Sequence, residues 1–384
     1  MSALKYWIWL STRTGIGAVR AKHLIDRFGT PEDVYHAGNR DYLDITGIKK
    51  DDINRLMNKD LTDANNILSS CAEIGCRTVT FQDSEYPDRL RNIYDPPLVL
   101  YVKGNLPYID DEVVVGIVGT RKCTPYGLVN AENIANKLSS RGVIVTTGLA
   151  LGVDTAAARG ALKGGSAIIG IIGCGLNVIY PPENKSIYED VASSGALISE
   201  YPPDTPPVKT HFPARNRIIS GISLGIAVIE APKQSGALIT AARALEQGRD
   251  VFTLPGNVDA ASCEGSNALL KEGAIPFVCA DDIIDEYIEL YPDRIGIQNK
   301  SISKKSFDNT AKVDYIDLVN LLGKLEGDEK SIVESIGLNS VTIDEVIDST
   351  GFPVQKILAA LTMLEISRYI IRANNGTWEI SGSR

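Results

Sequence analysis

Short apolar runs alternate with helical stretches between residues 113 and 287, and this alternation leaves few possible fold classes. The run Val113–Val118 contains only valine, isoleucine and one glycine, so a strand there would be buried on both faces. A helical pattern follows from Tyr126 to Ser140, and the glycine of Arg141-Gly142 stands where helices commonly end. Strands buried on both faces and separated by helices predict an α/β fold with a doubly wound parallel sheet. The other predicted strands are Val143–Thr147, Ala167–Ile172, Ala196–Ser199, Leu224–Glu230, Asp250–Leu254 and Ile275–Val278, and the helices between them include Val153–Lys163, Asn184–Ser193 and Ala237–Gln247.

A small all-helical domain is predicted before the sheet. Residues 1–75 carry two turns, Gly15-Ile16-Gly17 and Thr46-Gly47-Ile48, each followed by a helical pattern, as in helix-hairpin-helix or SAM-like modules. Such a turn lets backbone amides face a phosphate. However, this segment holds ten basic and ten acidic residues. A structural or protein-contacting role is therefore at least as well supported as DNA binding.

A winged helix is predicted at the other end of the chain. Three helical stretches precede a hairpin whose turn is Ala373-Asn374-Asn375-Gly376. The third stretch carries only Lys356 against Glu365, which is poor chemistry for reading DNA, so a protein-contacting role is favoured. The expected domains are the helical domain at 1–75, the sheet domain at 76–290, a polar linker at 291–312 and the winged helix at 313–384.

The composition restricts where the protein works and what it binds. Acidic residues outnumber basic ones and give a net charge of −9, so nucleic-acid binding would need a local basic patch. The six cysteines form no CxxC pair, and no zinc-ligand spacing occurs with only three histidines, so no metal is expected. The apolar run Tyr6–Leu10 is too short for a signal peptide, and no run approaches transmembrane length. We therefore expect a cytoplasmic protein with reduced thiols and no membrane contact.

Glycine-rich or polar turns follow almost every predicted strand. In open parallel sheets, ligands bind beyond the carboxyl ends of the strands, where helix N-termini present free amides. Five or more such turns on one edge, with Arg121 and the segment Lys209–Arg217 among them, predict an anion-binding face. The turns are Gly119–Lys122, Thr147–Asp154, Gly173–Asn177, Ser199–Pro202, Glu230–Gly236 and Pro255–Asn257.

The segment Lys209–Arg217 indicates which anion is bound. It holds three fixed cations, His211 and Phe212, and no acid interrupts the chain between Asp204 and Glu230. Cations that follow phosphates and a ring that stacks a base suit single-stranded nucleic acid. The alternative is that Phe212 fills the core while the arginines are solvated or paired with acids. We favour nucleic acid because the neighbouring turns form an anion-binding face.

Several catalytic motifs are missing from the sequence. No G-x-G-x-x-G follows the strand Val113–Val118, and no Gly-Lys-Ser/Thr completes a Walker A loop, so no dinucleotide cofactor or P-loop ATP hydrolysis is expected. His211 is the only histidine on the edge, and no nucleophile–base–acid set is recognisable. Glu200 and Glu230 could form a carboxylate pair, although each is also explained as a helix-amide acceptor or an arginine partner.

A series of motifs in order along the sheet region resembles the DNA-processing protein A (DprA/Smf) family. The resemblance implies a Rossmann-like domain that binds single-stranded DNA, protects incoming DNA in natural transformation and hands it to a RecA-type recombinase. Such a protein is a binding protein and not an enzyme, and it needs no cofactor. The motifs are Gly119-Thr120-Arg121, Gly148-x-Ala150-x-Gly152-x-Asp154, Gly173-x-Gly175 through Tyr180-Pro181, Phe212-Pro213-x-Arg215-Asn216-Arg217, Ser235-Gly236 through Thr240-Ala241, and Gly248-Arg249 through Pro255-Gly256.

The resemblance and the edge pattern together give a set of expected binding residues. Those expected to contact DNA are Thr120, Arg121, Lys122, Gly148, Lys209, Phe212, Arg215, Asn216, Arg217, Lys233, Ser235 and Gly236.

An alternative function belongs to a different class. A related Rossmann group hydrolyses the N-glycosidic bond of nucleotide monophosphates, and Ser235-Gly236-Ala237 with Glu230 or Glu200 could mimic its site. A groove that follows a strand requires Phe212, whereas a mononucleotide pocket does not. Release of free base from nucleotide monophosphates would separate the two functions.

A homodimer is expected through the end of the sheet domain. The segment Gly265–Ile275 predicts a short helix and an edge strand, and edge elements are where chains pair. Leu269 and Leu270 cannot both face one narrow core stripe, so one of them is free to meet a partner. The family resemblance also implies self-association here, with the recombinase contact close by. The expected interface residues are Asn267, Leu270, Lys271 and Ile275.

Overall fold

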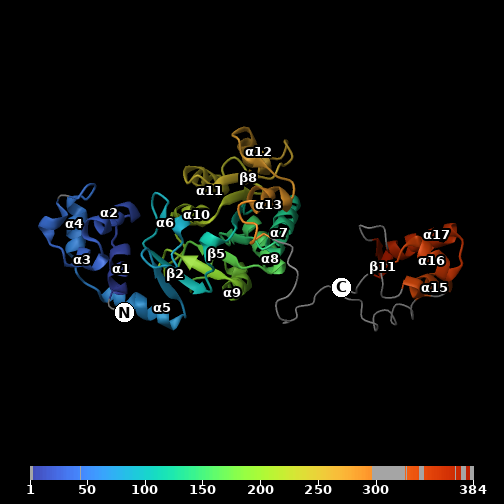
Figure 1. The fold of residues 1–384 in the computed structure, drawn as a ribbon, viewed down its shortest axis with the longest axis horizontal. Coiled ribbons are helices and arrows are strands. Elements are labelled where there is room, and N and C mark those ends of the chain that lie inside the picture. The colour runs from blue at the N-terminus through green and yellow to red at the C-terminus, as the bar shows by residue number, and fades with distance from the viewer. Residues whose placement is uncertain are drawn as a thin grey trace. The chain divides into compact units, whose positions relative to one another are not determined.

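The chain divides into two compact units, Met1–Lys300 and Ser301–Arg384. The computed structural model describes residues 3–43, 45–295, 325, 327–336, 341–367, 369–372 and 378–380 (Figure 1). In the first unit, the helical segment and the sheet share one cluster of buried apolar side chains. The boundary expected at residue 75 therefore falls inside a single unit, and the expected domain limits stay predictions. Residues 296–312 of the expected linker lie outside the described residues.

The helical start of the chain is built around a buried central helix. In α1 the five residues from Tyr6 to Leu10 are all buried, so the neighbouring helices surround it. The turn before α2 contains Gly15, which has a φ of +83°, a conformation that glycine adopts without strain. The all-helical character predicted for this segment is confirmed up to residue 73. The helices are α1 (Leu4–Ser11), α2 (Ala18–Phe28), α3 (Pro31–His36), α4 (Lys50–Met57) and α5 (Thr62–Glu73), with a 3₁₀ turn, η1 (Asn39–Tyr42).

Nine strands form one sheet within the described residues, in the order β1-β2-β6-β5-β4-β3-β7-β8-β9. The strands from β3 to β9 pair in parallel, as the apolar runs predict. However, β2 pairs antiparallel with β6, and β1 pairs antiparallel with β2, so the sheet is mixed. The sequence pattern missed β1 and β2 because no long helix separates them and β1 begins half-buried. The strands are β1 (Arg77–Thr80), β2 (Val99–Gly104), β3 (Val114–Val118), β4 (Ile144–Thr147), β5 (Ile168–Ile172), β6 (Ala196–Ser199), β7 (Gly225–Val228), β8 (Asp250–Thr253) and β9 (Ile275–Pro276).

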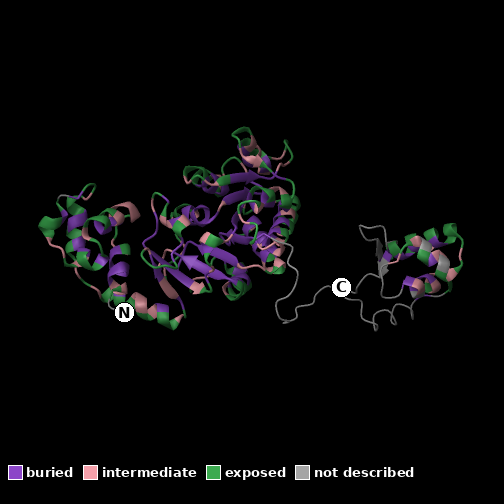
Figure 2. Cartoon of the chain, in the orientation of Figure 1, coloured by how far each residue is buried: buried purple, intermediate pink, exposed green. Residues whose placement is uncertain are grey.

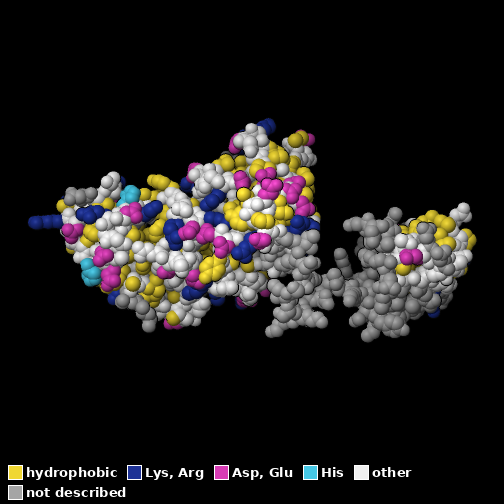
Figure 3. Space-filling model, in the orientation of Figure 1, with side chains coloured by type: hydrophobic (Ala, Val, Ile, Leu, Met, Phe, Trp, Pro, Cys, Tyr) yellow, Lys and Arg dark blue, Asp and Glu magenta, His cyan; other side chains and the backbone are white. Residues whose placement is uncertain are grey.

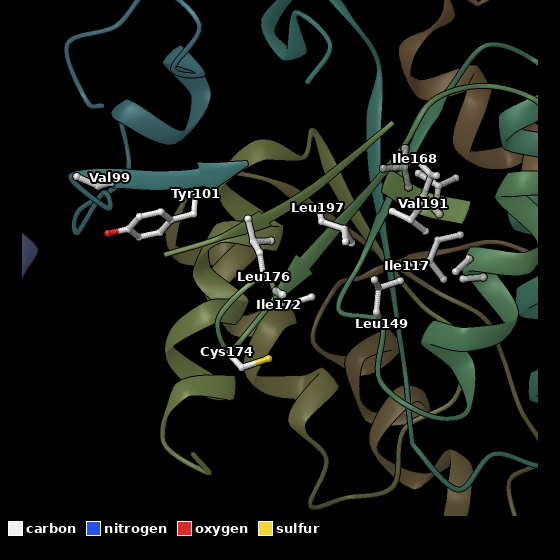
Figure 4. Close-up of a cluster of buried hydrophobic side chains, with 14 of the residues drawn as sticks. Val99, Tyr101, Ile117, Leu149, Ile168, Ile172, Cys174, Leu176, Val191 and Leu197 are labelled. Carbon is white, nitrogen blue, oxygen red and sulfur yellow. The ribbon is translucent and has the colours of Figure 1, made fainter. Parts of the chain in front are cut away.

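Helices cover both faces of the sheet, which confirms the doubly wound architecture. Side chains alternate along β3: Val115 and Ile117 join one buried cluster, and Val114 and Val118 join the other. The first cluster, part of which is drawn in Figure 4, includes side chains of α7 (Pro125–Ser140), α8 (Val153–Gly164), α9 (Lys185–Ser194) and α13 (Ala280–Ile288). The second includes side chains of α6 (Asp88–Arg91), α10 (His211–Ile222), α11 (Gly236–Glu246) and α12 (Glu264–Lys271). The sheet is therefore buried between two layers of helices (Figure 2).

The second unit contains the predicted winged helix. It has three helices, α15 (Gly327–Ile336), α16 (Ile343–Thr350) and α17 (Val354–Ile366), and the antiparallel pair β10 (Ile370–Arg372) and β11 (Trp378–Ile380). The turn expected at residues 373–376 lies outside the described residues. On α17 the ammonium of Lys356 lies 2.8 Å from a carboxylate oxygen of Asp328, while Val354, Leu358 and Met363 are exposed. The protein-contacting role of this unit stays a prediction.

In the described part of the chain, we find no helix that combines the length and the apolar character needed to cross a membrane.

Candidate nucleic-acid interface

A groove opens at the carboxyl ends of the central strands. The chain leaves β3 toward β4 on one side, and β7 starts the other half of the sheet on the opposite side of β3. Such a switch in strand order is where open α/β sheets bind ligands. The groove has a volume of about 780 Å³ and is lined by residues after β3, by α10 and by the start of α11.

Two glycines near the groove are required by close packing. Gly152, which precedes α8, has a φ of +80°, and a Cβ there would lie 2.5 Å from the Thr120 carbonyl oxygen. Gly148 follows β4, and a Cβ there would lie 2.6 Å from Nη2 of Arg215 and 2.7 Å from Oδ2 of Asp154. These contacts explain both glycines of the motif Gly148-x-Ala150-x-Gly152-x-Asp154, because a side chain at either position would push the turns apart.

Helix N-termini meet at this edge of the sheet. The hydroxyl of Thr124 caps α7 by accepting a hydrogen bond from the Gly127 amide at 3.3 Å. The hydroxyl of Ser235 caps α11 by accepting one from the Ala237 amide at 3.2 Å. Ser235 also lines the groove, together with Gly236. The partial positive charge of a helix start favours an anion there.

The segment Lys209–Arg217 lies mostly in the first turns of α10, which the sequence analysis did not predict. Lys209 is exposed just before the helix and lines the groove. The Phe212 ring is half-buried, with the Arg121 guanidinium carbon 5.4 Å from its centroid. The ring of Tyr180 lies 5.5 Å from the Phe212 ring at an interplanar angle of 33°. A cationic group and an aromatic wall therefore stand side by side in the groove.

Arg215 lines the groove but is almost completely buried. Its Nη1 donates hydrogen bonds to the carbonyl oxygens of Gly148, at 2.9 Å, and Ile171. Burial lowers the pKa of this guanidinium, and the nearby carboxylate of Asp154 opposes that shift. Burial raises the pKa of Asp154 to about 6, with Arg215 acting in the other direction. Arg215 thus holds the turn after β4 to the end of β5, and most of its side chain is not available to a ligand.

Arg217 does not lie in the groove, contrary to the expectation that it would contact DNA there. Its Nε donates to Asp95 at 3.1 Å, its Nη2 donates to Glu200 at 2.6 Å, and its side chain is only 8% exposed. The reason is the helix: two residues along α10 rotate a side chain by about 200°, so Arg217 faces away from Arg215. Its charge is compensated by two carboxylates on the other side of α10.

The remaining expected residues are distributed unevenly around the groove. Thr120, Lys122 and Asn216 line it, and Asn216 Nδ2 donates to the Gly236 carbonyl at 3.3 Å, which ties α10 to α11. Gly148 lines a smaller recess beside the groove, with Arg121 and Tyr180. Lys233 lines neither; it is exposed and lies 3.5 Å from a carboxylate oxygen of Glu264.

Tyr180 was missed by the sequence analysis as a binding residue. It lies in the connection between β5 and α9, more than thirty residues before Phe212 along the chain. The only signal was its place at the end of the motif that begins at Gly173.

The two glutamates of the alternative enzymatic function are engaged elsewhere. Glu230 is fully buried, and its Oε2 accepts hydrogen bonds from both the amide and the hydroxyl of Thr124 at 3.0 Å. It serves as an acceptor for the start of α7. Glu200 is paired with Arg217 outside the groove. Among the described residues, no group of three or more His, Cys, Asp or Glu is placed to hold a metal ion.

The expected dimer residues lie on α12 and β9, at the β9 edge of the sheet. Leu269 is buried, Leu270 is half-buried and Lys271 is exposed. The side chain of Asn267 bonds the backbone of Gly256, at 3.0 Å to its amide and 3.2 Å to its carbonyl oxygen. Leu270 is therefore the leucine that faces outward.

Comparison with known families identifies the fold. The family model of DNA recombination-mediator protein A matches residues 77–288, and that of the DprA winged helix domain matches residues 321–376. The chain belongs to the DNA-processing protein A (DprA/Smf) family. The resemblance stated from the motifs is thereby confirmed, and the winged helix belongs to the same family.

Relatives and solved structures extend the similarity over most of the chain. The chain is 30% identical over 385 residues to protein Smf of Synechocystis sp., covering 94% of each protein, and 40% identical over 223 residues to DNA processing protein DprA of Bacillus subtilis, covering 58% of this chain and 75% of that one. The X-ray structure of DNA processing protein A from Streptococcus pneumoniae matches 73% of this chain and 97% of its own with a TM-score of 0.66 and 32% identity. A structure of DNA processing protein A from Helicobacter pylori, described for its single-stranded DNA binding mode, matches 56% of this chain and 97% of its own with a TM-score of 0.52 and 30% identity.

Proposed function

We propose that the chain binds single-stranded DNA in the groove between α10, α11 and the turn after β3. Lys209, Arg121 and Lys122 neutralise phosphates, and the start of α11 adds partial positive charge. Bases stack on Phe212. The expected contacts of Arg217 and Lys233 are not part of this proposal, because Arg217 is enclosed by two carboxylates and Lys233 lies outside the groove.

One observation carries this proposal: the Arg121 guanidinium, the Phe212 ring and the Tyr180 ring stand together in the groove. A ring offers a face to a base only when that base is not paired and stacked inside a duplex. The arrangement thus favours single strands over double strands. The description of the Helicobacter pylori relative by its single-stranded DNA binding mode supports the same ligand.

The surface charge is consistent with a local site. Positive and negative side chains are interspersed on the face drawn in Figure 3, and the whole chain has a net charge of −9. Attraction of DNA would therefore come from the few uncompensated cations of the groove, with little help from the rest of the surface.

The experiment that tests the proposal is a salt series with single-stranded and double-stranded oligonucleotides of equal length. The logarithm of the single-strand affinity should fall by roughly 0.7 per neutralised phosphate for each tenfold rise in salt. The duplex should bind more weakly at every salt concentration. Equal affinity for the two forms, or an affinity independent of salt, would contradict the proposal.

Membership of the family supports a cellular role, which is part of the same proposal. The chain would protect single-stranded DNA in the cytoplasm and load a RecA-type recombinase onto it during natural transformation. The test is whether the chain, added to single strands covered by a single-strand-binding protein, speeds formation of recombinase filaments. A chain with Phe212→Ala should lose this effect together with its DNA affinity.

We further propose that the chain acts by binding and not by catalysis. The observation in support is that Glu230 and Glu200 are both engaged outside the groove. Incubation with nucleotide monophosphates should release no free base. Saturable release of base would instead support the N-glycosidic hydrolase function.

Self-association through α12 and β9 completes the proposal. Leu270 is half-buried beside the edge strand β9, where a second copy could cover it. Two grooves held together would raise the apparent affinity for long strands through effective concentration.

A further inference from the structure

A second and larger cleft lies on the other side of the first turn of α10. It has a volume of about 1090 Å³, and Pro213 lines both this cleft and the groove. Consecutive residues of a helix are rotated by about 100°. Phe212 therefore faces the groove, while its neighbour His211 lines the cleft. The turn is a narrow ridge with an aromatic side chain on each side.

The rings of His211 and Tyr201 form a stacked pair in this cleft. Their centroids are 3.9 Å apart and their planes differ by 15°, and both residues line the cleft. Nδ1 of His211 lies 3.2 Å from the Gly173 carbonyl oxygen, which fixes the imidazole in place. The Tyr201 amide donates to the Ser199 hydroxyl at 3.0 Å, which holds the backbone that carries the other ring. A pre-formed parallel stack of this kind offers a face that a nucleobase can extend.

We propose that a single strand bound in the groove continues over Pro213 into the cleft, where a further base stacks on the His211–Tyr201 pair. This inference rests on the proposed function and adds a second binding platform to it. The two platforms are Phe212 on one side of the ridge and the stacked pair on the other.

The cleft contributes through stacking because its charges are compensated. On the α10 side, Arg217 is paired with Asp95 and Glu200. Of the other two arginines that line it, Arg20 lies 3.0 Å from Asp52 and Arg243 lies 2.7 Å from Glu246. Phosphates passing through the cleft would therefore release few counterions. The second platform should add affinity without steepening the salt dependence.

The glycine turn of the helical segment lies on the wall of the same cleft. Thr14, Gly15 and Gly17, which precede α2, line it. The turn thus borders the path of the strand, and the neutral charge of the helical segment agrees with a site that works by stacking.

The test compares Tyr201→Leu with wild type on short and long oligothymidylates, of about six and about twenty nucleotides. Leucine keeps apolar bulk and removes the ring. On the long oligonucleotide, Tyr201→Leu should weaken binding by about fivefold or more, with an unchanged salt slope. On the short one, which the groove alone can hold, its affinity should equal that of wild type. Tyr108→Leu is the matched control, because Tyr108 is 75% exposed and lines neither groove nor cleft.

Equal losses on both lengths, no loss on the long strand, or a reduced salt slope would each overturn the second platform. The comparison is repeated in a Leu270→Arg background, so that pairing of two copies on one long strand does not imitate the effect. If Tyr201→Leu lowers the melting temperature markedly, His211→Ala takes its place in the comparison of short and long strands. A 2-aminopurine base placed at successive positions of the long strand, whose fluorescence is quenched where it stacks, tests the second platform without any substitution. In wild type the quenched positions should form two separate groups, and a single group would contradict the inference.

Failure of the proposed function itself would look different. In that case wild type would bind neither length, or Phe212→Ala would leave short-strand affinity intact. A loss confined to long strands cannot arise from a defect in the groove alone.

Discussion

Replacing Phe212 by alanine tests the groove most directly, because this ring stands outside the packed core. It is half-buried and belongs to neither of the two buried clusters of the sheet. Its ring neighbours are the guanidinium of Arg121, at 5.4 Å, and the ring of Tyr180, at 5.5 Å. Both of these neighbours line the recess beside the groove. The substitution thus removes a stacking surface and leaves the sheet packing intact.

The magnitude follows from these contacts. Stacking of a base on an aromatic side chain contributes about 1–3 kcal/mol, so Phe212→Ala should weaken single-strand binding by roughly 5- to 150-fold. The ring contacts with Tyr180 and Arg121 contribute about 1 kcal/mol to the fold. The free energy of unfolding should therefore fall by only about that amount, plus a modest loss of half-buried apolar area.

Fluorescence anisotropy with a labelled oligothymidylate measures the affinity, and chemical denaturation measures the free energy of unfolding. Phe212→Leu is the matched variant, since it keeps the apolar bulk and removes the ring. It should lose affinity nearly as much as the alanine variant, while its free energy of unfolding falls by no more than the ring contacts contribute, about 1 kcal/mol. A loss of about 3–5 kcal/mol in stability with unchanged affinity is what a core phenylalanine would give, and that result would refute the stacking role.

Other substitutions test separately the charge of the groove, the stability of the fold and the formation of a dimer. Arg121→Glu should reduce both the single-strand affinity and the salt slope, measured in the same anisotropy series. Arg217→Ala should lower the melting temperature, because it leaves Asp95 and Glu200 without their cation, and should change the salt slope little. Burial raises the pKa of Asp154 from an unfolded value of about 3.9 to about 6, so the folded state favours the protonated carboxyl. This contributes about 2–3 kcal/mol to the free energy of unfolding below pH 4, and the contribution is lost as the pH rises through 6. Asp154→Asn should therefore be destabilised less, relative to wild type, at pH 7 than at pH 4 in denaturation curves. Leu270→Arg should be folded and monomeric by light scattering, and a dimer that persists would move the interface elsewhere.

The parallel part of the sheet could be predicted because burial on both faces leaves a continuous apolar run. The side chains of β3 point alternately into the two buried clusters, Val115 and Ile117 into one and Val114 and Val118 into the other. Neither face of this strand can therefore carry a polar residue. The strands β1 and β2 escaped the prediction for different reasons. The start of β1 is half-buried, so no apolar run marks it. β2 does carry the buried apolar run Val99–Val102, but it joins the sheet antiparallel and no long helix separates it from β1, so the strand–helix alternation does not mark it.

The sequence predicted which turns border the site, but not which side chains face the groove. The glycine turns did lead to one groove, because the carboxyl ends of parallel strands meet at one edge. The helix α10 was missed because Pro213 lies in its first turn, where proline is tolerated although it usually signals a break. When the segment is taken as a loop, Arg215 and Arg217 would be neighbouring cations of one patch. In the helix α10 they point to opposite sides.

The helix also explains how a segment with so few free cations can still suit DNA. Asp154 lines the groove, and the carbonyl oxygens of Gly148 and Ile171 lie near the ends of β4 and β5. These oxygens would repel phosphates if nothing compensated them. Arg215 donates to both carbonyls and stands beside the carboxylate, so it makes the floor of the groove tolerable to an anion without needing to touch one.

Loss of Arg215 would therefore weaken the fold and the binding together, and neither effect could be assigned to a contact with DNA. Lys209 and Arg121 are different, because both are exposed and no ion pair engages them among the described residues. Changes at these two positions alter the charge that a strand meets and leave the strand ends in place. The change in salt slope when either residue is replaced therefore reports how many phosphates it neutralises in the groove.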